Sequence, residues 1–126
     1  GAGVDEACPD FSGGLEAFQT LRAILVASVR GGGPDISARQ MAILLTIYLE
    51  PPPHTVRGLA AKLNVTKPVI TRALDAMGAR KLVTRHRDPR DKRNVVISRT
   101  VEGSQYLERF ADLIITKAVD LLNEGF

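Results

Sequence analysis

"LAAKLNVTKPVITRALDAM", residues 59–77, has the pattern of two short helices joined by a tight turn. Ala60 is small enough to lie where the two helices touch, and Asn64, four residues later, tolerates the left-handed backbone that such a turn requires. Val65 and Ile70 then supply apolar side chains that can bury the second helix. The spacing predicts a helix-turn-helix, a motif whose second helix can enter the major groove of DNA.

The residues that face outward at the start of the second helix suit contact with DNA. Lysine and arginine can reach guanine acceptors or phosphates, threonine can bond either, and a proline ring can touch a thymine methyl group. The alternative is a plain helical hairpin with a polar outer face. We expect the DNA contacts of this helix to come from Thr66, Lys67, Pro68, Thr71 and Arg72.

Capping signals delimit the helices around this motif. Ser37 and Gln40 have the spacing of a capping box, which predicts a helix that runs from there to the three prolines at 51–53. Thr55 and Thr66 are expected to cap the two helices of the motif, the second of which should end near residue 80.

Two short strands, at 82–87 and 94–99, are expected to follow the second helix and to form a hairpin. Residues 66–99 contain ten basic residues against three acidic ones, so this block is strongly positive on a chain whose net charge is only +3. A hairpin placed there lies over the sugar–phosphate backbone, and a cationic tip can enter the minor groove. The sequence therefore predicts a mainly α fold with a small β-hairpin wing: a winged helix-turn-helix with a DNA-binding core at 37–99 and a wing at 82–99.

Two further helices, at 14–30 and 101–123, flank this core. The last helix carries two adjacent apolar stripes, so that one stripe can face its own domain while the other faces a partner. We expect residues 1–126 to form a single domain that dimerises through these N- and C-terminal helices. The stripe of the first helix consists of Leu15, Phe18, Leu21, Leu25 and Val29.

The chain resembles the MarR family of bacterial transcriptional regulators. The likeness rests on "LAAKLNVTKPVITRALDAM", on "LVTRHRDPRDKRNVVIS" as strand and wing, and on "TVEG" at the start of the last helix, and it covers residues 37–105 well. Asp91-Lys92-Arg93 matches the Asp-x-Arg motif of the family. The resemblance implies that Arg93 enters the minor groove, that Asp91 holds the wing in shape, and that the protein is an obligate dimer. Arg90 and Lys92 complete the expected contacts of the wing.

The sequence departs from the family pattern at two positions beside the wing and in its length. Lys81 stands where the family usually has glycine before the first wing strand, and Arg99 stands where it usually has leucine. In a regular strand Arg99 shares a face with Val95 and Ile97, so we expect it to snorkel or to find an acidic partner. Arg99→Leu is then expected to be neutral or stabilising. The chain is also short for the family, with one helix in place of the last two.

Several function classes lack support in the sequence. The single cysteine, Cys8, excludes an intrachain disulfide, and Cys8, His54 and His86 have no metal-ligand spacing. His54 is expected in a loop, His86 on the wing surface, and Tyr48 in the core. No catalytic constellation and no membrane-length apolar run is visible, so we expect neither an enzyme nor a cofactor or metal, and a cytoplasmic location.

The function predicted from these observations is a sequence-specific regulator that binds double-stranded DNA. We expect the protein to be a repressor that binds a pseudo-palindromic operator as a homodimer. A small-molecule effector is a further expected partner. The alternative is a winged-helix module that binds another protein and has no operator. The basic wing argues against this alternative.

Overall fold

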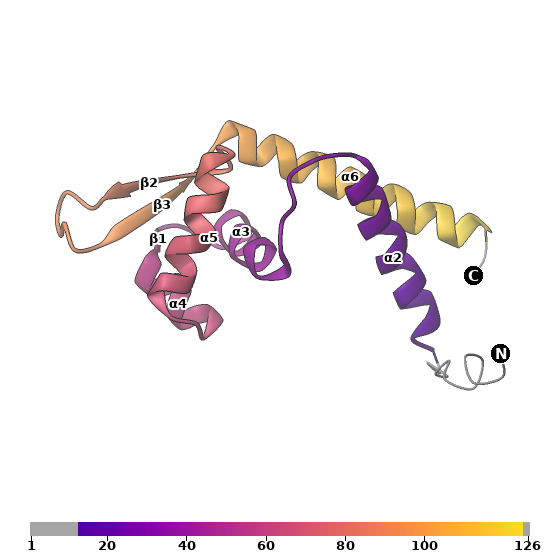
Figure 1. The fold of residues 1–126 in the computed structure, drawn as a ribbon, viewed down its shortest axis with the longest axis horizontal. Coiled ribbons are helices and arrows are strands. Elements are labelled where there is room, and N and C mark those ends of the chain that lie inside the picture. Colours follow the sequence, from indigo (N-terminus) through magenta and orange to yellow (C-terminus); the bar gives the residue numbers. More distant parts are fainter. Residues whose placement is uncertain (1–12, 125–126) are drawn as a thin grey trace. The chain divides into compact units, whose positions relative to one another are not determined.

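The computed structural model describes residues 13–124, and Cys8 lies outside them. The chain is mostly helical with one small antiparallel sheet, as expected (Figure 1). The helices are α2 (Leu15–Arg30), α3 (Ala38–Leu49), α4 (Val56–Leu63), α5 (Lys67–Ala79) and α6 (Val101–Glu124), and the strands are β1 (His54–Thr55), β2 (Val83–Arg87) and β3 (Val95–Arg99).

The chain divides into two compact units. One unit contains α2 and the part of α6 from Phe110 onward. The other, Pro34–Arg109, contains α3, α4, α5, the sheet and the first turns of α6. The DNA-binding core predicted at 37–99 lies inside this second unit, and the expectation of one domain over 1–126 stays a prediction.

The helix caps of the second unit follow the local sequence, with one exception. Ser37 Oγ accepts a hydrogen bond from the Gln40 N–H at 3.1 Å and Gln40 Oε1 accepts one from the Ser37 N–H at 3.0 Å, which confirms the capping box. Thr55 Oγ1 caps α4. Thr66 occupies the N-cap of α5, but its side chain makes no capping bond, because Pro68 has no N–H and the Val69 N–H bonds to the Thr66 carbonyl. The expected side-chain cap is therefore wrong.

The core of the second unit lies where α3, α4, α5 and the wing base meet. Ala60 is buried between the helices of the motif, and Asn64 ends α4 in the left-handed conformation, with φ 54° and ψ 48°. Both features confirm the predicted turn. The buried apolar side chains are Ile43, Leu44, Ile47, Leu59, Ala60, Ile70, Ala73, Leu74, Met77, Leu82, Val83 and Ile97.

The sheet contains a strand that sequence patterning did not predict. Its order is β1–β3–β2, and His54 of β1 pairs with Ile97 of β3. The His54 side chain is only 5% exposed, and its Nε2 donates to the Glu50 carbonyl oxygen at 3.0 Å. The expectation of a loop histidine is therefore wrong: His54 is a hydrogen-bonded core residue that joins α3 to the sheet.

Lys81 adopts the conformation that makes glycine favourable at its position. Its φ is +63°, in the left-handed region, where a Cβ is strained.

We expect Lys81→Gly to raise the free energy of unfolding by about 0.5–1 kcal/mol, because relief of strain outweighs the extra freedom of glycine in the unfolded chain. Urea denaturation measures this difference. Lys81→Ala, which also removes the exposed side chain but keeps Cβ, should be close to neutral. Equal stabilities of the glycine and alanine variants would contradict the explanation.

Arg99 finds partners other than the expected acid. Its guanidinium donates to two backbone carbonyl oxygens, those of Ile47 at 2.9 Å and Glu50 at 2.8 Å, and the side chain stays exposed. The expectation that the side chain at position 99 lies in an apolar environment beside Val95 and Ile97 is wrong. A leucine at this position would leave both carbonyl oxygens without these donors. Arg99→Leu is therefore no longer expected to be neutral or stabilising.

The α2–α6 unit exposes much apolar surface. None of the α2 residues is buried, and Phe18, Leu25 and Val29 are exposed, the last by 80%. On α6, Ile115 is 60% exposed and Leu122 is 70% exposed. Within residues 13–124, no helix has the length and apolar character needed to cross a membrane.

Candidate nucleic-acid interface

The first turn of α5 presents the predicted DNA-contacting residues to solvent. Its apolar side is buried through Ile70, Leu74 and Met77, which fixes the rotation of the helix in the unit. Neither Lys67 nor Arg72 forms an ion pair with another described residue, so both cations remain available. The exposed residues of this turn are Thr66, Lys67, Pro68, Thr71 and Arg72.

The tip of the wing is organised by Asp91 and Arg93. Asp91 Oδ1 accepts hydrogen bonds from the Arg93 backbone N–H and from Arg93 Nε, both at 3.1 Å. Hydrogen bonds from the side chain and then the backbone of Arg93 lower the pKa of Asp91, so the group is a carboxylate at neutral pH. The Arg93 side chain is nevertheless 86% exposed. The carboxylate thus holds the base of a side chain whose charged end is free to reach a ligand.

Backbone contacts close the loop of the wing around this pair. Asp88 Oδ1 accepts from the Arg90 N–H at 2.9 Å, and Arg87 Nη1 donates to the Lys92 carbonyl oxygen at 2.8 Å. The side chains of Arg90 and Lys92 are exposed and form no ion pair with any described residue. The loop therefore displays three cationic side chains, those of Arg90, Lys92 and Arg93.

Three residues of this region were missed by sequence reasoning. Arg85 of β2 and Asp75 of α5 form an ion pair at 2.7 Å that ties the wing to the recognition helix. The charge of Arg57 in α4 also lowers the pKa of Asp91, by less than the Arg93 hydrogen bonds do. Only Val83 of β2 is buried, and charge alone favours a surface position for Arg85, but its partner on α5 depends on the tertiary structure.

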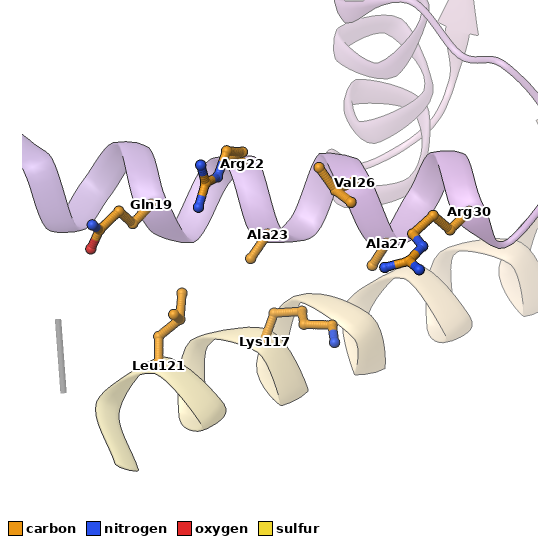
Figure 2. A pocket seen from close by; sticks show the side chains of 8 residues that line it. All are labelled: Gln19, Arg22, Ala23, Val26, Ala27, Arg30, Lys117 and Leu121. Atoms are coloured by element: carbon orange, nitrogen blue, oxygen red, sulfur yellow. The ribbon is translucent and has the colours of Figure 1, made fainter. Parts of the chain in front are cut away.

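The α2–α6 unit contains an open groove of about 760 Å³. Figure 2 shows its lining from both helices, with Arg22 and Arg30 on α2 and Lys117 on α6 around apolar side chains. Among the residues that the structure describes, no acidic side chain lines it and none forms an ion pair with the three cations. The lining consists of Gln19, Arg22, Ala23, Val26, Ala27, Arg30, Lys117 and Leu121.

Part of the second unit is similar to a known family. Residues 36–95 match the model of the MarR family. The matched segment contains α3, α4, α5 and β2, and so includes every residue predicted to contact DNA.

Solved structures of MarR-type proteins have the same fold. The chain is similar to CouR, a transcriptional repressor solved with a 23-mer DNA duplex, at 27% identity over 86% of this chain and 73% of that one, with a TM-score of 0.65. It is similar to YusO from Bacillus subtilis at 18% identity over 86% and 74% of the chains, with a TM-score of 0.72. An S. aureus MepR mutant bound to an oligodeoxyribonucleotide gives 20% identity over 88% and 76%, with a TM-score of 0.68. No curated protein sequence matches the chain. The fold of the chain is thus a winged helix-turn-helix.

Proposed function

We propose that this protein is a MarR-family transcriptional regulator that binds double-stranded DNA with sequence specificity and represses from a pseudo-palindromic operator. The observation that carries the proposal is the exposed, unpaired cationic turn of α5, in the same compact unit as a wing tip with three exposed cations, of which Arg93 is paired with Asp91. The DNA-bound structures of CouR and of the MepR mutant support this assignment. The proposal involves no catalytic step, cofactor or metal, and it places the protein with the DNA in the cytoplasm.

The proposed roles follow from side-chain chemistry. Arg72 and Lys67 reach base acceptors or phosphates in the major groove, Thr66 and Thr71 bond to either, and Pro68 touches a thymine methyl group. In the wing, Arg93 enters the minor groove while Asp91 fixes its position, and the flanking cations Arg90 and Lys92 contact phosphates. These roles stay proposals.

Alanine variants of one arginine in α5 and one arginine in the wing test the proposal. Arg72→Ala should weaken binding by about 1–3 kcal/mol and relax the preference at particular base positions, because a base contact is lost. Arg93→Ala should weaken binding to many sequences and reduce the preference for A·T pairs beside the half-site. Selection of bound sequences from a random duplex pool, followed by titration of the best site at moderate salt, measures both effects.

The matched control is Arg109→Ala, which removes an exposed arginine from α6 and should change affinity little. If the affinities of both Arg72→Ala and Arg93→Ala equal that of the unmodified protein, the DNA-binding proposal fails. The alternative, a winged-helix module that binds another protein, predicts in addition that random duplex DNA does not bind at any salt concentration. A DNA-binding wing instead predicts binding that weakens steeply as salt rises.

A homodimer and a small-molecule effector complete the proposal. The exposed apolar side chains of Leu25 and Val29 on α2 and of Ile115 and Leu122 on α6 support the homodimer. The groove between these helices supports the effector, since Arg22, Arg30 and Lys117 surround its apolar lining without an acidic counter-charge. That lining matches a small amphipathic anion.

A further inference from the structure

The end of α3 lacks backbone donors for its last carbonyl groups. In a continuing helix, the carbonyls of Ile47, Tyr48 and Leu49 would accept from the N–H groups four residues later. Those positions are Pro51, Pro52 and Pro53, which have no N–H to donate. The prolines that end the helix therefore also leave its terminal carbonyls in need of donors from elsewhere in the chain.

Arg99, at the end of the wing strand β3, supplies a donor to the first of these carbonyls and a second donor to the carbonyl of the C-cap residue Glu50, which also accepts from His54 Nε2. Arg99 Nε donates to the Ile47 carbonyl oxygen at 2.9 Å and Nη2 donates to the Glu50 carbonyl oxygen at 2.8 Å. The guanidinium carbon lies 6.0 Å from the centre of the Tyr48 ring, within the range of a cation–π contact. A positive charge at the C-terminus of a helix is also favoured by the helix dipole.

The residue after Arg99 is held to the same helix. The Thr100 N–H donates to the Tyr48 hydroxyl oxygen at 2.9 Å, and that hydroxyl donates to the Leu82 carbonyl oxygen at 2.6 Å. Because β3 pairs with β2 continuously from Arg99 to Val95, the hairpin extends from this base as one hydrogen-bonded ladder. The position of the wing tip, with Arg93, therefore depends on how the base of β3 is fixed to α3.

We propose that Arg99 is a positioning residue for DNA binding, which fixes the wing on the end of α3 and so sets the place of Arg93 at the tip. This inference rests on the proposed function, in which Arg93 contacts DNA. It explains why arginine is useful at a position where leucine is usual in the family: a leucine fills space but cannot bond two carbonyl oxygens. Arg99 itself need not touch DNA.

A double-mutant cycle between Arg99 and Arg93 separates positioning from a general loss of stability. In the otherwise unmodified protein, Arg99→Leu should weaken binding to the selected duplex by about tenfold and reduce the preference for flanking A·T pairs. In the Arg93→Ala background the same change should have almost no further effect, since the contact that Arg99 positions is already gone. Arg99→Lys keeps the charge and one donor group, and should recover part of the affinity and of the A·T preference.

Additive losses in the two backgrounds would overturn the positioning role, and so would an unchanged A·T preference in Arg99→Leu. Amide hydrogen exchange of residues 83–99 without DNA gives an independent readout. Exchange should be faster in Arg99→Leu than in Arg99→Lys, and equal rates would also overturn the inference. A failure of the unmodified protein to bind any duplex would instead count against the proposed function, while the exchange experiment would still decide whether Arg99 anchors the wing.

Discussion

Gly103→Ala is expected to lower the free energy of unfolding by about 2–4 kcal/mol, although alanine is the better helix former. Gly103 is buried in the first turn of α6, and a Cβ there would overlap the Tyr48 hydroxyl and the Leu82 carbonyl oxygen. Backbone cannot move aside easily, and a displaced hydroxyl would lose its hydrogen bonds to Leu82 and Thr100. Overpacking and the lost hydrogen bonds therefore exceed the helix propensity that alanine gains, about 1 kcal/mol.

Gly78→Ala is the matched control for this experiment. Gly78 also lies in a helix, α5, but a Cβ there would meet nothing closer than the Val83 carbonyl oxygen at 4.0 Å. This variant should be neutral or more stable by up to about 1 kcal/mol, because only helix propensity changes. Thermal and urea denaturation of both variants provide the comparison. Equal effects of the two substitutions would show that close packing at Gly103 has no special role.

Tyr48→Phe tests which atom causes the overlap. Removing the hydroxyl takes away the nearest of the three atoms that a Cβ would meet, while the Leu82 carbonyl oxygen and the Tyr48 ring carbon Cζ remain. Gly103→Ala should therefore be less destabilising in the Tyr48→Phe background than in the unmodified protein. This result would also explain the glycine of "TVEG": it lets the start of α6 approach the end of α3 closely enough for the Tyr48 hydroxyl to join them.

Features that depend on neighbours in the sequence were predictable, and features that depend on distant segments were not. The capping box at Ser37 and the left-handed Asn64 follow from residues within one helical turn, and the structure confirms both. The pairing of His54 with Ile97, and the bonds of Arg99 to a helix end about 50 residues earlier, arise only when α3 and β3 meet. From residue type alone, an acidic partner was expected for Arg99. Backbone carbonyl acceptors are present in every residue, so no sequence signal indicates which of them a side chain will bond.

The candidate site follows the same division. The exposed first turn of α5 was predictable, since the apolar period of the helix determines which residues face outward. The ion pair between Asp75 and Arg85 was not, because it requires the wing to fold back beside α5. Sequence patterning therefore predicts which residues of α5 are exposed better than it predicts the contacts that hold them in place.

Replacing both Ile115 and Val119 with lysine is expected to split the proposed homodimer and to abolish tight operator binding. Both side chains are exposed and apolar on one stripe of α6, with Leu122 beside them, and a partner helix would bury them. Two lysines in such an interface would be desolvated without counter-charges. We expect a monomer in sedimentation equilibrium at micromolar concentration.

Loss of the dimer should weaken specific binding by about 100-fold or more, because a single subunit reads only one half-site. The two recognition helices of a two-fold dimer would engage half-sites about 34 Å apart, one turn of DNA, so footprints should show this spacing only for the unmodified protein. The added lysines raise the net charge above +3, so weak binding to any duplex should persist or increase. If specific binding is lost while weak binding to any duplex persists, the added positive charge cannot be the cause of the loss.

Thr116→Lys combined with Asn123→Lys is the matched control, since it adds the same charge at exposed polar positions of α6. This variant should remain dimeric and should keep its operator affinity. A monomeric unmodified protein that still binds a single non-palindromic site tightly would refute the arrangement. So would an Ile115→Lys/Val119→Lys variant that remains dimeric, because the partner surface would then have to lie elsewhere than on this stripe of α6.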